Sequence, residues 1–156
     1  MQLRKYSIFL LLVIWCSSLL ADEATVTLVT PSGELQISAN ELRAMAGNEL
    51  EIYDPFQRVS IPVRGVDLID FIEHFATDHS QASRLKFIAS DDYETHISQW
   101  NSGNWLLVTH ENGHELRLRD HGPIKLVEKS LGNRNPENLR NFNDWVWMIT
   151  TIEVLE

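Results

Sequence analysis

The chain has 156 residues, a formal net charge of −9 at pH 7 and a single cysteine, Cys16. An acidic surface repels nucleic acid and anionic lipid, so the charge argues against both as partners. Because the only cysteine lies near the N-terminus, the rest of the chain offers no thiolate for metal, nucleophilic or redox chemistry.

Residues 1–21 have the layout of a secretory signal peptide: a basic start, an apolar run, and then small or short residues up to Ala21. The apolar run is too short for a transmembrane helix. A lipoprotein signal would use Cys16, but Trp15 is larger than the residue usual before a lipidated cysteine. We therefore expect cleavage after Ala21 and an exported protein that does not span the membrane, with one domain over residues 22–156.

The first elements of the expected domain are a hairpin and a short helix. Apolar and polar residues alternate over 25–38 on both sides of the turn at 31–33, which predicts a β-hairpin. Ser38 and Glu41 have the spacing of a capping box, which predicts a helix that continues to Met45.

Two short strands and a second helix are expected next. Residues 50–53 and 59–63 have strand character, and Pro62 indicates an edge strand or a bulge. Helical periodicity over 65–75 predicts an amphipathic helix. Its apolar face is expected to comprise Val66, Leu68, Ile69, Ile72 and Phe75.

The second half of the chain is rich in strand signals. Asn112-Gly113 between apolar arms gives the strongest hairpin signal, and a helix is expected from an N-cap at Asn135. The expected strands and helix cover residues 84–90, 93–98, 104–118 (the hairpin), 123–128, 135–142 (the helix) and 147–155. Strands with scattered short helices predict an α+β domain built around a mixed sheet or a small barrel.

Four segments in this order resemble the sulfite-oxidase-type molybdopterin-binding fold, and above all its short, secreted, single-domain members. They are residues 64–72, 89–98, 106–127 and 143–154. No single motif among them is specific, and the resemblance rests on their order and spacing over residues 25–156. It implies a sulfite-oxidase-like mixed β-sheet or barrel domain with short helices.

The chain departs from this family at the metal. Catalytic members bind molybdenum through a cysteine just before the Gly-Val helix start, which corresponds here to residues 52–58, and no cysteine is there. Since a soft thiolate fixes and tunes such a centre, its absence argues against an oxidoreductase that uses molybdenum. A pterin pocket without molybdenum is still compatible with the fold.

Short members without the cysteine resemble periplasmic regulators that hold a reduced pterin. The resemblance implies a periplasmic, non-catalytic sensor that binds a tetrahydropterin. Such a sensor signals to the periplasmic domain of an inner-membrane protein that makes or degrades cyclic-di-GMP. Two alternatives stay open: a molybdopterin-dependent oxidoreductase with altered ligation or another pterin-dependent catalyst, and an assembly partner derived from such an enzyme.

Four residues are the main candidates for the ligand site. Asp92 and Tyr93 are expected at the amino-pyrimidinone edge of a pterin, where a carboxylate can accept two hydrogen bonds; an aromatic ring can also stack on the pterin face. The alternative for Asp92 is a solvated β-turn carboxylate. His121 can hydrogen-bond the ring, while Gly122 allows close approach of the backbone. Phe56, Asn143 and Trp145 are weaker candidates for the pocket wall.

Phe56 and Trp145 have structural alternatives. Phe56 can be a loop aromatic folded onto the core, and alternation in the expected last strand predicts that Trp145 or Trp147 is a core residue. Six histidines are present, but none has metal-ligand spacing, so no metal site is expected.

The stretch 116–129 concentrates basic residues in an acidic chain. Arg117, Arg119 and Lys125 alternate with apolar residues, which predicts the outward face of two strands. The resemblance implies the alternative that this region holds an anionic group, with Arg134 and Arg140 extending it.

Overall fold

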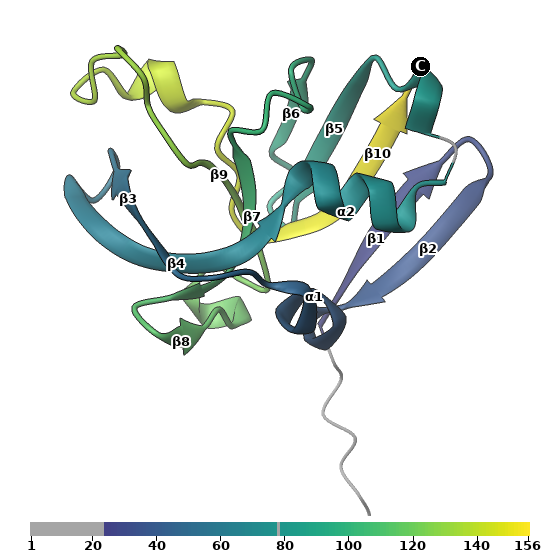
Figure 1. Cartoon of the computed structure of the whole chain (residues 1–156), viewed down its shortest axis with the longest axis horizontal. Coiled ribbons are helices and arrows are strands. Elements are labelled where there is room, and N and C mark those ends of the chain that lie inside the picture. Colours follow the sequence, from purple (N-terminus) through teal and green to yellow (C-terminus); the bar gives the residue numbers. More distant parts are fainter. Residues whose placement is uncertain (1–23, 78) are drawn as a thin grey trace, which may run out of the picture.

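The computed structural model describes residues 24–77 and 79–156, so the expected signal peptide, residues 1–21, lies outside the described residues. Over these ranges the chain forms ten β-strands, two α-helices and three short 3₁₀ helices, which confirms the α+β class (Figure 1). No helix in the described ranges is long and apolar enough to cross a membrane.

The first sheet is mixed and has five strands in the order β2-β1-β10-β5-β6. Its strands are β1 (Thr25–Thr30), β2 (Gly33–Ser38), β5 (Arg84–Ala89), β6 (Glu94–Ile97) and β10 (Ile149–Leu155). β1 and β10 are parallel, while the other neighbours are antiparallel. Strand β10 therefore lies at the centre of this sheet, between the predicted β1–β2 hairpin and the β5–β6 pair, whose two strands the sequence also predicts.

Helix α1 (Ala39–Met45) confirms the predicted capping box. The Glu41 amide donates to the Ser38 hydroxyl at 3.2 Å, and the Ser38 amide donates to the Glu41 carboxylate at 2.8 Å. The Ser38 amide, and then the Ser38 hydroxyl, lower the pKa of the Glu41 carboxyl. The helix therefore begins where the sequence places it, because a local hydrogen-bond pattern fixes its start.

The second sheet also has five strands, and three of them, β4, β8 and β9, pair with β7. Its strands are β3 (Leu50–Asp54), β4 (Val59–Asp67), β7 (Trp105–Glu111), β8 (His114–Glu115) and β9 (Lys125–Glu128). The order is β3-β4-β7-β8, with β9 also paired to β7. Figure 1 shows β4 as a long, curved strand that crosses the molecule and leads into α2.

Strand β4 is longer than predicted and is not an edge strand. Residues 63–67 pair with β7, so α2 (Leu68–Phe75) starts later than Gly65. Pro62 pairs with β3, just beyond the point where the pairing of β4 with β7 ends. The predicted irregularity is a bulge, and it lies after Pro62, between Arg64 and Gly65. Long-range pairing thus overrides the helical periodicity that begins at Gly65.

The later start of α2 changes its buried face. The buried side chains are Leu68, Phe71 and Ile72. Ile69 and Phe75, which the periodicity placed on this face, are only partly buried. Val66 is buried as well, but as a residue of β4 rather than of the helix.

The hairpin at Asn112-Gly113 is confirmed, but its second arm stops at Glu115. Residues 105–108 of β7 pair with β9, on the same edge that β8 uses at 110–111. The Leu116 amide still donates to the Thr109 carbonyl of β7 at 2.8 Å. Since β9 occupies the rest of that edge, the chain then leaves the sheet and forms the 3₁₀ helix η2 (Leu118–Asp120). The prediction that Arg117 and Arg119 alternate along a strand is therefore wrong, although both are exposed.

The segment before β10 is irregular and joins the two sheets. The expected helix 135–142 is a turn followed by the 3₁₀ helix η3 (Leu139–Phe142), and β10 begins at Ile149 instead of Trp147. Val146 forms a bridge with Leu126 of β9, through N–O distances of 2.7 and 3.1 Å. A third 3₁₀ helix, η1 (His79–Gln81), precedes β5.

Both sheets and both α-helices contribute to one continuous core. Its largest fully buried side chains include Trp145, Phe71, Phe87 and Phe142. Trp145 and Phe142 are also lining residues of a cavity beside this core.

Candidate functional site

The candidate site is a cavity of about 880 Å³ lined by residues from both sheets. The turn after β3, the β5–β6 turn, the end of β7, the start of β9 and the segment 142–148 all contribute. Its aromatic lining residues are Phe56, Tyr93, Phe142, Trp145 and Trp147. Its charged lining residues are Asp54, Asp91, Glu111, Arg119, Asp120 and Lys125.

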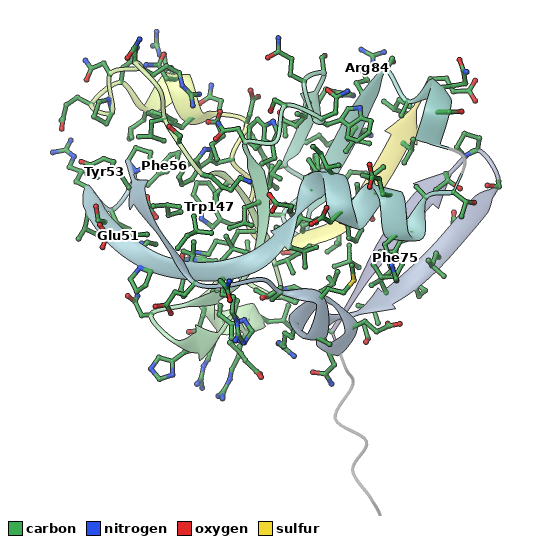
Figure 2. The ribbon with its side chains drawn as sticks, in the orientation of Figure 1. Glu51, Tyr53, Phe56, Phe75, Arg84 and Trp147 are labelled. Carbon is green, nitrogen blue, oxygen red and sulfur yellow. The ribbon has the colours of Figure 1, made fainter. Side chains whose placement is uncertain are left out.

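The aromatic wall is built from residues that contact one another. Phe56 meets Trp147 edge to face with ring centroids 4.7 Å apart, and Phe56 and Trp145 lie 6.1 Å apart. Figure 2 shows Phe56 and Trp147 on the side of the molecule that carries β3, away from Phe75 and Arg84. Phe56 packs on both tryptophans, yet it remains 38% exposed and lines the cavity.

Asp54 organises the turn that carries Phe56. Its buried carboxylate accepts from the amides of Phe56 (2.8 Å) and Gln57 (3.0 Å) and from the Gln57 side chain (2.9 Å). Asp favours turns because its side chain binds the backbone in this way. Asp54 therefore shapes the cavity rim, since its oxygens already have protein partners.

Glu128 and Arg134 hold Trp145 and Phe142 in place. The buried Glu128 carboxylate accepts from Trp145 Nε1 at 3.2 Å and from Arg134 at 2.5 Å. The Arg134 guanidinium also donates to two backbone carbonyls and lies 4.9 Å from the centroid of Phe142. Arg134 thus uses its donors within the fold, contrary to the alternative that it extends an anion-binding wall.

Lys125 is a buried residue of the cavity and does not face outward as predicted. Its side chain is 3% exposed, and its ammonium donates to the Glu111 carboxylate, whose side chain is 18% exposed. All four residues of β9 are buried, so alternation does not separate an inner from an outer face in this strand.

Tyr93 lies in the cavity, and its neighbour there is Asp91 rather than Asp92. The Tyr93 hydroxyl donates to the Asn143 carbonyl at 2.5 Å, and the Tyr93 amide donates to the Asp91 carboxylate at 3.2 Å. Asp92 is exposed, has a φ of 64°, and is not among the lining residues. The tight β5–β6 turn places Asp92 in the left-handed region, which Asp tolerates.

His121 lines the cavity, whereas Gly122, which was predicted to line it, does not. The His121 carbonyl accepts from the Met148 amide at 3.0 Å, which ties this turn to the segment before β10. Gly122 is buried, and a Cβ there would lie 2.8 Å from the carbonyl carbon of Leu116 and 2.9 Å from the Arg117 oxygen. The glycine is therefore required for close backbone packing, and the Gly122–Pro123 bond that follows is cis.

A second hollow of about 570 Å³ adjoins the first along the β7–β8 hairpin. The two hollows share Glu111, Arg119 and Asp120. None of the residues that line the second hollow is a Phe, Tyr or Trp. A ligand that fills both hollows would therefore combine a flat apolar part with a polar extension.

A buried histidine lies at the base of the same hairpin. Arg64 donates to His110 Nε2 at 2.7 Å, so Nδ1 carries the proton and donates to the Thr109 hydroxyl at 2.8 Å. Burial, and then the charge of Arg64, lower the pKa of His110 below its ordinary value. The imidazole is consequently neutral at pH 7.

The donors do not fit a molybdenum centre of the type that the resemblance implies. None of the lining residues is a cysteine, and Cys16 lies outside the described ranges. Within the described residues, no group of three or more His, Cys, Asp or Glu side chains is arranged to hold a metal ion.

The structure brings together five of the residues predicted for the site. They are Phe56, Tyr93, His121, Asn143 and Trp145. Sequence reasoning missed Glu111, Lys125 and Trp147. A lysine within the apolar run 124–127 is a signal that could have singled out Lys125.

Comparison of the chain with protein-family models and with curated protein sequences found no match.

Proposed function

We propose that this chain is a periplasmic pterin-binding sensor with a sulfite-oxidase-like fold. The observation that carries the proposal is the cavity itself, which combines five Phe, Tyr and Trp residues with an ion pair between the buried Lys125 and the partly buried Glu111. A reduced pterin is flat, largely apolar on its faces and rich in donors and acceptors along its edge. Aromatic rings therefore suit its faces, and charged or polar groups suit its edge.

The size and chemistry of the cavity support a ligand of this class. Small-molecule sites have volumes of roughly 300–1,000 Å³ and combine aromatic walls with a few polar groups. The cavity, at about 880 Å³, leaves room for a pterin with a side chain. Offset or edge stacking contributes about 1 kcal/mol beyond the area that is buried.

The segment where the resemblance places the molybdenum cysteine lies at this cavity. Asp54, Phe56 and Gln57 line it, and Phe56 presents a ring there instead of a thiol. An aromatic ring at that position favours the binding of a flat ligand over the ligation of a metal. The signalling role, with a cyclic-di-GMP protein of the inner membrane as partner, rests on the resemblance alone.

Mass spectrometry of the denatured protein tests the binding proposal. Protein purified from its natural compartment should release a pterin, and ligand-free protein should show a higher Tm when a tetrahydropterin is added. Absence of a released pterin together with an unchanged Tm would contradict the proposal. Molybdenum at a one-to-one ratio would instead favour the oxidoreductase alternative.

A second experiment tests the signalling role separately. Deletion of the gene should change the cellular level of cyclic-di-GMP, and a Trp147→Ala variant should restore the level less fully than the wild type. A Leu35→Ala variant is the control, because Leu35 is exposed on β2 and does not line the cavity. An unchanged level in the deletion strain would remove the cyclic-di-GMP role and leave pterin binding standing.

A further inference from the structure

Lys125, which is buried, and Glu111, which is partly buried, form an ion pair at the wall of the cavity. Lys125 is 3% exposed and Glu111 is 18% exposed at the side chain, and both line the cavity. Removing two charges from water costs several kcal/mol per ion unless further hydrogen bonds satisfy them. A pair placed here therefore needs partners beyond the single bond between its members.

The pair lacks those partners within the described part of the chain. The Lys125 ammonium has three donors, and its one protein acceptor there is Glu111 Oε1. Glu111 Oε2 accepts no hydrogen bond from the described residues. Two donors and one carboxylate oxygen thus remain beside the cavity for solvent or a ligand.

Lys129 and Asp67 provide a comparison within the same protein. They form an ion pair of the same type at 2.5 Å, but their side chains are 30% and 44% exposed. Water can satisfy the remaining donors and acceptors at that surface. At Lys125 and Glu111 the neighbouring space is instead a cavity walled by aromatic residues.

We infer that Lys125 and Glu111 are the polar anchor of the site and recognise a lactam edge, a ring carbonyl next to a ring N–H. The ammonium donates to the carbonyl oxygen, and the carboxylate accepts from the adjacent N–H. Phe56 and Trp147 hold the face of the same ring. This inference rests on the proposed function and deepens it, because it assigns the 4-oxo edge of the pterin to these two residues.

The anchor predicts discrimination between two closely related ligands. A 4-oxopterin presents an acceptor to Lys125, whereas a 2,4-diaminopteridine presents an amino group at the same position. Two donors would then face each other in a poorly solvated site, which leaves both without partners. The wild-type protein should bind the 4-oxo compound at least about tenfold more tightly, or about 1.4 kcal/mol.

The test measures the dissociation constants of 6-hydroxymethyl-tetrahydropterin and its 2,4-diamino counterpart for wild-type protein and variants by calorimetry, without oxygen so that both compounds stay reduced. Lys125→Met should weaken binding of the 4-oxo compound by at least about tenfold and remove the preference. The matched control Lys129→Met should leave both constants unchanged. Retention of the preference by Lys125→Met would overturn the inference.

Loss of one partner of a buried pair can prevent folding, so a double variant is included. Lys125→Met with Glu111→Met replaces both charges by apolar side chains of similar length, which is often close to neutral for stability. It should fold, bind pterin weakly and show no preference. Equal affinity of the wild type for the two compounds would overturn this inference and leave the proposed function intact. Binding of neither compound would overturn both.

Discussion

Phe56 and Trp147 meet edge to face at 4.7 Å, although they lie far apart in the chain. Phe56 belongs to the turn that follows β3 in one sheet, and Trp147 belongs to the segment that enters β10 in the other. One wall of the cavity therefore exists only when the two sheets are joined. The Val146–Leu126 bridge holds that junction beside the wall.

Trp147→Ala should weaken pterin binding more than it weakens the fold. Loss of a stacking partner of about 1 kcal/mol predicts an affinity lower by roughly fivefold, measured by calorimetry. Trp147 is only partly buried, so the chain should still fold cooperatively. Leu35→Ala, on the exposed face of β2, is the control and should bind normally. An unchanged affinity in Trp147→Ala would place the ring of the ligand elsewhere.

Arg134→Met should destabilise the protein. The change leaves the buried Glu128 carboxylate without its charged partner while Trp145 still donates to it. Breaking a fully buried pair costs about 3–5 kcal/mol, and the partial exposure of Arg134 reduces this to roughly 2 kcal/mol. Urea unfolding measures the difference.

Arg140→Met is the control for that experiment, since Arg140 is exposed and forms no ion pair with any described residue. Its free energy of unfolding should lie within about 0.5 kcal/mol of the wild type. Equal stability of both variants would show that Glu128 does not depend on Arg134.

His110 should make the protein less stable in mild acid. The pKa of His110 in the folded chain lies below its ordinary value of 6.5, so the unfolded chain takes up the proton first as the pH falls. The stability that the neutral imidazole contributes is complete above pH 6.5 and is lost as the pH falls below that value. The free energy of unfolding should therefore decrease between pH 7.5 and pH 5.5, values chosen to bracket 6.5.

His110→Gln should reduce this pH dependence, because the amide does not titrate. The control is His96→Gln, a change at an exposed position of β6. An identical pH profile for wild type and His110→Gln would assign the acid sensitivity to other groups.

Gly122→Ala should destabilise the turn that carries His121. The added Cβ would lie within 3 Å of the backbone of Leu116 and Arg117, and backbone atoms cannot move aside as a flexible side chain can. Overpacking of this kind costs about 1–3 kcal/mol, measurable by denaturant unfolding. Gly47→Ala is the control, since its nearest contact would be at 3.9 Å. Equal stability of the two variants would mean that the turn can shift.

Some features follow directly from the sequence, because short-range patterns specify them. The hairpin turns at 31–33 and at Asn112-Gly113, and the Ser38–Glu41 capping box, all appear where the sequence predicts. Each depends on residues only a few positions apart. The sequence also predicted that the site is aromatic. Phe56, Tyr93 and Trp145 were candidates because of their residue types and their positions in the segments that carry the resemblance.

Other features depend on which strand occupies which edge. The β8 arm is short because β9 takes the same edge of β7, and that competition cannot be read from either segment alone. The same pairing buries Lys125, whose alternation with apolar neighbours predicts a solvated side chain.

The sequence by itself determined the α+β class, the local turns and caps, and the absence of a cysteine from the segment 52–58. Only the tertiary structure decided that the buried Lys125 pairs with Glu111 in a cavity with aromatic walls, and that Asp91 rather than Asp92 borders the cavity. The physical reason is that local patterns fix backbone conformation, whereas burial and ion pairing depend on contacts between segments that are distant in the chain.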